Sequence, residues 1–238
     1  MWKRGETPTP TAIVVAHRGG ALLGAGDLAA TVDVLVGLGV EMLEFDVRMT
    51  ADDVLVVHHD ANRDDMELCK HTYAELTAGG RSLIKLDDFL RGVAGRLALD
   101  VELKETGYES KVMSTVLAHA STERIVVTSF HDDALRAVRH ATPSVATGLL
   151  VGGLRGLRRP RILLGNVFPF GRFVRCDADF LASSYRLLVL TGLMRRARRH
   201  RVGVVVWTVN DSKAYGRLRR MSGVLGIVTD SVDLMKTD

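Results

Sequence analysis

Short runs rich in valine, isoleucine and leucine alternate with amphipathic stretches about eight times along this chain of 238 residues. Such runs predict buried β-strands, and the stretches between them predict helices. Strands that alternate with helices form parallel sheets. Eight such units in a chain of this length predict a closed (β/α)8 barrel, for which about 250 residues are typical. The rival, an open doubly wound sheet, is disfavoured because no GxGxxG pattern follows the first strand run.

The alternation sets the order of the predicted elements. Strands are expected at residues 12–16, two within 42–60, 97–104, 124–130, 147–151, 174–181, 202–209 and 225–229. Helices are expected at residues 27–38, 72–78, 86–93, 109–120, 132–140, 192–201 and 211–221, with Asp27 as the first N-cap. Residues 152–173 mix arginines with apolar side chains and are expected to be irregular. We favour a surface loop there over the alternative, a lid or a membrane-contacting loop.

Composition indicates one barrel domain over residues 1–238, with residues 1–11 as an N-terminal tail. The chain is 47% hydrophobic and 25% charged, which is ordinary for a globular protein. The net charge is +4, and the basic residues do not interleave with aromatic ones, so nucleic acid is not an expected partner. Two cysteines are too few for a disulfide scaffold or a zinc cluster. With no hydrophobic signal core near the start, we expect a cytoplasmic protein.

Charged side chains gather in the stretch MLEFDVRMTADDVLVVHHD at residues 42–60. Glu44 and Asp46 are two residues apart on a predicted strand, so both carboxylates point to one face of the sheet. The second run of this stretch ends at His58 and His59, and we favour His59 because it shares a strand face with Val57. Two carboxylates and a histidine at strand ends predict an oxygen-rich metal site beside an acid/base group.

Other polar groups follow other predicted strands. His17 and Arg18 end the first strand, Glu102 and Lys104 share one face of the strand at 97–104, and Trp207 stands near the end of 202–209. A barrel carries its chemistry at the C-terminal ends of its strands, so these side chains are expected to converge on one mouth. The position of His17 at a strand end, followed at once by Arg18, favours a site for an anion there.

With these residues in hand, the chain resembles the glycerophosphodiester phosphodiesterase family. The matching pieces occur in the family's order: AHRGG at 16–20, LEFDV at 43–47, VLVVHHD at 54–60, VELK at 101–104, VVTSFHDDAL at 126–135, VVWTVND at 205–211 and GIVTD at 226–230. The resemblance implies a (β/α)8 barrel of the phospholipase-C-like phosphodiesterase type. It also implies hydrolysis of a glycerophosphodiester to glycerol 3-phosphate and an alcohol, with one divalent cation, Mg²⁺ or Ca²⁺.

The resemblance also assigns roles by position. Glu44, Asp46 and Glu102 match the metal carboxylates, and His17 and His59 match the acid/base pair. The remaining matches are Arg18 and Lys104 as phosphate contacts and Trp207 as an aromatic wall. In the family model the substrate's own glycerol hydroxyl attacks first, and water then opens the cyclic phosphate.

Two departures from the family keep alternatives open. Family members usually carry Glu-Asn-Thr where this chain has Gly26-Asp27-Leu28, and the segment after His59 is short, which favours a more open mouth. The first alternative is a lysophospholipase D acting on a lysophospholipid, with peripheral membrane contact through residues 152–173. The second is a catalytically weakened barrel that binds a phosphodiester. The oligomeric state is not readable from the residues.

Overall fold

The structure, a computed structural model, describes residues 2–4, 11–19, 28–93, 95–152 and 160–233, with only the backbone for 160–163. Eight parallel strands close into a barrel, because β1 pairs in parallel with both β11 and β2. These strands are β1 (Ile13–His17), β2 (Met42–Met49), β6 (Ala98–Leu103), β7 (Ile125–Ser129), β8 (Ala146–Val151), β9 (Phe180–Ser184), β10 (Gly203–Trp207) and β11 (Val224–Thr229). The predicted (β/α)8 barrel is confirmed.

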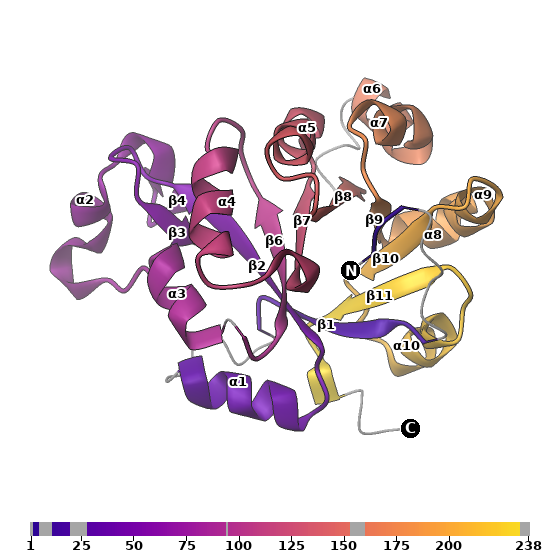
Figure 1. Ribbon diagram of the computed structural model, residues 1–238, viewed down its shortest axis with the longest axis horizontal. Helices are drawn as coiled ribbons and strands as arrows, with labels where there is room; N and C mark the ends of the chain where they lie inside the picture. The colour runs from indigo at the N-terminus through magenta and orange to yellow at the C-terminus, as the bar shows by residue number, and fades with distance from the viewer. Residues whose placement is uncertain (1, 5–10, 20–27, 94, 153–159, 234–238) are drawn as a thin grey trace.

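Helices surround the ring of strands, as Figure 1 shows. In chain order they are α1 (Leu28–Gly37), α3 (Leu86–Val93), α4 (Glu109–Leu117), α5 (Asp132–Ala141), α6 (Pro160–Val167), α7 (Phe170–Arg175), α8 (Tyr185–Thr191), α9 (Leu193–Arg199) and α10 (Ser212–Arg219). Their apolar faces bury the outward side chains of the strands; Phe45 of β2 packs on Phe89 of α3 with ring centroids 4.7 Å apart. None of the helices in the described part of the chain is long and apolar enough to cross a membrane.

A small antiparallel unit is added to β2 before α3. Strand β3 (Leu55–Val57) runs antiparallel to β2 and is followed by a hairpin of β4 (Asn62–Arg63) and β5 (Met66–Glu67). Helix α2 (Tyr73–Thr77) follows, and Thr72 and Glu75 form a capping box at its start. Short 3₁₀ turns lie at Leu68–Lys70, Ala78–Gly80 and, before β7, Thr122–Arg124.

The structure of residues 160–191 differs from our predictions. The expected strand at 174–181 is wrong at its start, because Phe170–Arg175 is helix α7 and β9 begins only at Phe180. The expected irregular segment contains α6 and α7, while residues 153–159 lie outside the described part. Helix α8 was missed; Ser184 caps its start, and Gly192, with a positive φ of 62°, separates it from α9.

Residues 2–4 close the N-terminal end of the barrel. The Trp2 ring packs edge-on against Phe180 with centroids 5.2 Å apart, and a side chain at Gly226 would collide with it. Lys3 Nζ donates to the carbonyls of Pro143 and Val145 at 2.6 and 2.8 Å. The start of the predicted tail is therefore packed against the barrel. The predicted N-cap Asp27 lies outside the described residues.

Candidate active site

Three carboxylates meet on neighbouring strands inside the mouth of the barrel. Glu44 and Asp46 point inward from β2, and Glu102 of β6 lies in register with Asp46. All three are buried, and oxygens of the three groups lie within 4.8 Å of one another. Leu43, Phe45 and Val47 belong to the core between sheet and helices, so the predicted alternation along β2 holds.

The carboxylates carry an excess of buried negative charge. Burial raises the pKa of Glu44 well above its ordinary 4.5, and the charges of Asp46 and Glu102 raise it further. Burial likewise raises the pKa of Glu102 to about 7, although Lys104 opposes the shift. Glu44 Oε1 is buried without a hydrogen bond. Hard, crowded oxygens with unused lone pairs fit a divalent cation such as Mg²⁺ or Ca²⁺.

Two cationic side chains border the carboxylates. Lys104 Nζ lies 2.7 Å from Asp46 Oδ1 and 2.5 Å from Glu102 Oε1. The contact to Asp46 lacks hydrogen-bond geometry, since Oδ1 has no hydrogen-bond partner. Arg18 Nε lies 3.2 Å from Asp46 Oδ2, and the backbone N–H of Arg18 donates to Glu44 Oε2 at 3.0 Å. Arg18 has a positive φ of 51° in the turn directly after β1.

His17 is held by groups that the sequence analysis missed. Its Nδ1 lies 2.6 Å from Asp230 Oδ1, and its Nε2 faces Glu44 Oε2 at 3.9 Å. Asn210 donates to the other Asp230 oxygen at 2.7 Å and accepts the Asp230 N–H at 2.9 Å. Asp230 and Asn210 follow β11 and β10 inside the motifs GIVTD and VVWTVND, so their position after a strand was the available signal.

His59 faces the pocket from the turn after β3. Its Nδ1 lies 2.8 Å from Asp60 Oδ1. Burial, and then the charge of Lys104, lowers the pKa of His59 below its ordinary 6.5, which favours a neutral imidazole at neutral pH. His58 is not among the residues that line the pocket, and its Nε2 lies 3.4 Å from the carbonyl oxygen of Asn62.

A buried arginine ties His59 to the strands that carry the carboxylates. Arg48 lies on the same face of β2 as Glu44 and Asp46, and its Nε and Nη2 donate to the His59 carbonyl at 3.0 and 2.8 Å. Its Nη1 pairs with Glu105, the residue after Lys104. Arg48 thus fixes the backbone of His59 relative to the ends of β2 and β6.

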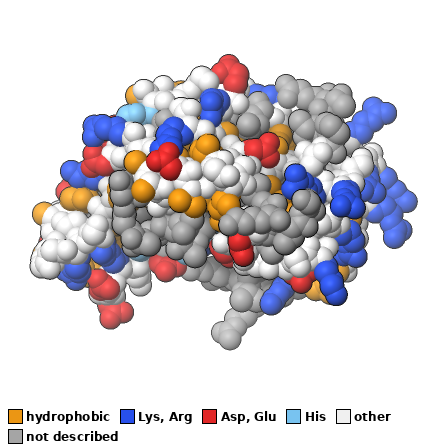
Figure 2. Space-filling model, turned by 90° about the horizontal axis from the view of Figure 1, so that it is seen from below, with side chains coloured by type: hydrophobic (Ala, Val, Ile, Leu, Met, Phe, Trp, Pro, Cys, Tyr) orange, Lys and Arg blue, Asp and Glu red, His pale blue; other side chains and the backbone are white. Residues whose placement is uncertain are grey.

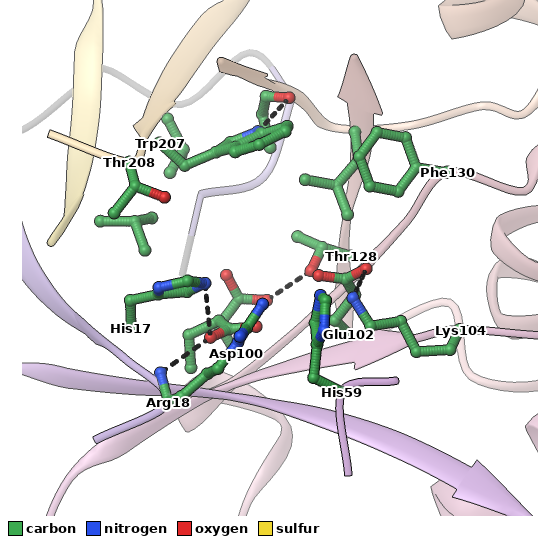
Figure 3. A pocket seen from close by; sticks show the side chains of 15 residues that line it. His17, Arg18, His59, Asp100, Glu102, Lys104, Thr128, Phe130, Trp207 and Thr208 are labelled. Carbon is green, nitrogen blue, oxygen red and sulfur yellow. Dashed lines mark hydrogen bonds and ion pairs between the residues drawn. The ribbon is translucent and has the colours of Figure 1, made fainter. Parts of the chain in front are cut away.

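The side chains enclose one pocket with a polar side and an apolar side (Figure 3). Its volume is about 590 Å³, including solvent at the mouth. The lining residues are His17, Arg18, Glu44, His59, Asp100, Glu102, Lys104, Thr128, Phe130, Leu150, Ala182, Val205, Trp207, Thr208 and Val228. Figure 3 shows the rings of Trp207 and Phe130 across the pocket from the two imidazoles. Trp207 Nε1 donates to the Ala182 carbonyl at 3.0 Å, which fixes the ring.

The pocket gathers the predicted residues and adds a further buried carboxylate, Asp100. Seven of the eight predicted side chains line it, and Asp46 lies directly behind, within the carboxylate cluster. Asp100 was not predicted as a site residue, although it shares the inward face of β6 with Glu102. It accepts a hydrogen bond from Thr128 at 2.8 Å, and burial raises its pKa to about 7.

The raised pKa values predict a pH-dependent stability. Glu102 and Asp100 titrate at about 7 in the fold, against 4.5 and 3.8 ordinarily, so the folded protein binds more protons than the unfolded chain between these values. After dialysis against EDTA, the melting temperature should therefore fall as pH rises from 5 to 8, by roughly 10 °C. Calorimetry checks this, and Asp100→Asn should flatten the slope; an unchanged slope in this variant would contradict the assignment.

Carboxylates, imidazoles and cations converge at the mouth of this barrel, which is where (β/α)8-barrel enzymes carry their active sites. The fold and the site together therefore define a (β/α)8-barrel enzyme. The chain belongs to the glycerophosphoryl diester phosphodiesterase family, whose model matches residues 17–80 and 98–234. It is similar to a protein named glycerophosphodiester phosphodiesterase from Caldanaerobacter subterraneus subsp. tengcongensis, with 24% identity over 94% of this chain and 96% of that one.

Solved structures share the fold. A glycerophosphodiester phosphodiesterase from Parabacteroides distasonis superposes with a TM-score of 0.75 at 23% identity, covering 96% of both chains. A phosphodiesterase from Oleispira antarctica, solved in complex with the product sn-glycerol-3-phosphate, superposes with a TM-score of 0.74 at 18% identity, covering 95% of this chain and 96% of that one.

Proposed function

We propose that this protein hydrolyses glycerophosphodiesters to glycerol 3-phosphate and an alcohol, using one divalent cation. The observation that carries the proposal is the cluster of Glu44, Asp46 and Glu102, flanked by two imidazoles and two cations in one pocket. The bound product in the Oleispira antarctica phosphodiesterase supports the product class. Cytoplasmic location stays a prediction from the sequence.

The two sides of the pocket suit the two parts of such a substrate. Arg18 offers a planar fork and Lys104 a point charge, so both can bind the non-bridging phosphate oxygens. The rings of Trp207 and Phe130, in edge-to-face contact at 5.8 Å, offer an apolar wall for the carbon skeleton. Asp100 is placed to accept a hydrogen bond from a substrate hydroxyl.

Proton transfer falls to the two histidines. His59 is neutral at neutral pH and can accept the proton of the attacking hydroxyl. His17 presents Nε2 to the pocket, because Nδ1 is engaged by Asp230, and can protonate the leaving alcohol. A cation held by Glu44, Asp46 and Glu102 supplies Lewis-acid polarisation of the phosphoryl group when bound.

A coupled assay for released glycerol 3-phosphate tests this function. The substrates are glycerophosphocholine, glycerophosphoethanolamine and glycerophosphoglycerol. The lysophospholipase D alternative is tested separately by the choline released from lysophosphatidylcholine, because that reaction leaves lysophosphatidic acid and no glycerol 3-phosphate. We expect release from at least one glycerophosphodiester, loss of activity in EDTA and recovery with Mg²⁺ or Ca²⁺. Absence of release from all of them would favour the phosphodiester-binding barrel instead.

Arg48→Lys is expected to lower kcat about 10–100-fold with little change in KM, because a lysine cannot hold the His59 carbonyl and Glu105 together. Arg139→Lys is the matched control, since Arg139 binds Asp179 far from the pocket. If Arg48 acts through His59, adding Arg48→Lys to His59→Ala causes no further loss. A further loss in the double variant would mean that Arg48 acts by another route.

A further inference from the structure

The most exposed apolar side chains of the described residues are concentrated in one part of the chain. Large apolar side chains at least 55% exposed occur there only between residues 164 and 190. We name four of them the apolar rim: Leu164 (60%), Phe168 (60%), Val189 (55%) and Leu190 (83%). Exposed leucines and phenylalanines that gather in one place mark an interaction surface, whereas single ones do not.

Contacts join the two halves of the apolar rim. Leu164 accepts the backbone N–H of Phe168 at 2.8 Å, so the two stand one helical turn apart at the end of α6. The Arg196 guanidinium lies 5.1 Å from the centroid of the Phe168 ring and donates to the Thr191 carbonyl at 3.3 Å. Phe168 therefore lies beside the end of α8, where Val189 and Leu190 are exposed.

Helix α8, which carries half of the apolar rim, starts at the mouth of the barrel. Helix α8 starts at the Ser184 cap, and Ser184 lies in register with Trp207, which lines the pocket. Helices α6 to α9 lie together at one end of the molecule in Figure 1. A surface that held the apolar rim would consequently lie close to the pocket.

Arginines without an ion-pair partner in the described residues flank the apolar rim, whereas Arg172 and Arg175 of α7 pair with Asp132. The basic flank consists of Arg186, Arg195, Arg196 and Arg199, none of which has an ion-pair partner in the described part of the chain. The acidic residues between 160 and 201 are Asp177 and Asp179, and both pair with Arg139. Figure 2 shows Lys and Arg side chains gathered at the end of the molecule where α8, α9 and α10 lie in Figure 1.

We propose that the apolar rim and the basic flank dock this protein on an anionic lipid bilayer. Leu190 and Phe168 match the acyl boundary of a bilayer, and the arginines match its phosphate headgroups. A second copy of the chain would set arginines against arginines, which is repulsive. A nucleic acid would leave the leucines and valines without a suitable contact, since bases stack on aromatic rings.

Sedimentation with vesicles tests the proposal on the full chain, independently of turnover. We expect the protein to pellet with phosphatidylcholine vesicles that contain 30 mol% (about a third) phosphatidylglycerol, to stay in solution with pure phosphatidylcholine, and to be released by about 0.5 M NaCl. Arg195→Gln/Arg199→Gln should weaken partition about 30-fold, from about 1 kcal/mol per basic residue. Phe168→Asn/Leu190→Asn should weaken it at least about tenfold.

Control variants separate docking from general effects. Val34→Asn/Val36→Asn replaces an exposed apolar pair on α1 and should leave partition unchanged. All variants should keep the wild-type melting temperature and the rate on a soluble glycerophosphodiester. The proposal is overturned if wild-type protein does not pellet with anionic vesicles, or if the rim and flank variants pellet equally well. The proposal is also overturned if light scattering shows that the wild-type protein is a dimer and that Leu190→Asn dissociates it.

Discussion

His59→Ala is expected to lower kcat for glycerophosphodiester hydrolysis by about 10²–10⁴-fold, the usual contribution of one acid/base group. The reason is that His59 is the imidazole in the pocket that burial and Lys104 keep neutral, and hence able to accept a proton. His17→Ala should cause a loss of similar size. The fold should persist in both, since both side chains stand at the mouth and not in the core.

His58→Ala is the matched control, because His58 is the chain neighbour of His59 but does not line the pocket. It should retain most of the wild-type rate. The pH dependence gives a second measurement. As the pH falls, His59 is protonated and can no longer accept a proton, so kcat/KM should decrease. Because the pKa of His59 is lowered, this decrease should lie below about pH 6.5, the ordinary pKa of histidine. This acidic limb should vanish in His59→Ala. If His58→Ala lowers kcat as much as His59→Ala does, the choice of His59 over His58 as the acid/base residue is wrong.

Regularities of strand geometry made much of the fold and site predictable. Parallel strands place their C-terminal ends at one mouth, so groups as distant in sequence as His17 and Trp207 could be expected in one pocket. The period of two along a strand placed Glu44 with Asp46, and Glu102 with Lys104, on the inward face. The same rule places Asp100 beside Glu102 and Arg48 beside Asp46 on the inward faces of their strands, but the period alone assigned neither of them a role.

Other features depend on contacts that no local pattern specifies. The start of β9 was misplaced because Val174, a residue type that favours strands, belongs to the end of helix α7. The Asp230 carboxylate reaches His17 across 213 positions of sequence, and Arg48 binds a backbone carbonyl, which has no signature in the sequence. Trp2 seals the barrel floor only because Gly226 leaves room for its ring.

Glu44→Gln should abolish measurable Mg²⁺ or Ca²⁺ binding in calorimetry and lower kcat about 10³-fold, or roughly 4 kcal/mol. Its effect on stability should depend on the metal. Without metal, burial and the charges of Asp46 and Glu102 disfavour the Glu44 carboxylate, so a neutral amide should raise the melting temperature in EDTA. With metal, the wild-type protein should gain stability by RT ln(1 + [M]/Kd), and the variant should not.

The Glu44→Gln variant should therefore melt at a higher temperature than the wild-type protein in EDTA, and at a lower temperature when metal is present. A variant that merely loosens packing would not show this exchange. Glu109→Gln is the matched control, because Glu109 is also buried but accepts the Gly107 N–H outside the cluster, at 3.0 and 2.9 Å. It should keep the full stabilisation by metal. If Glu44→Gln gains as much stability from metal as Glu109→Gln does, the cation is bound elsewhere and Glu44 is not its ligand.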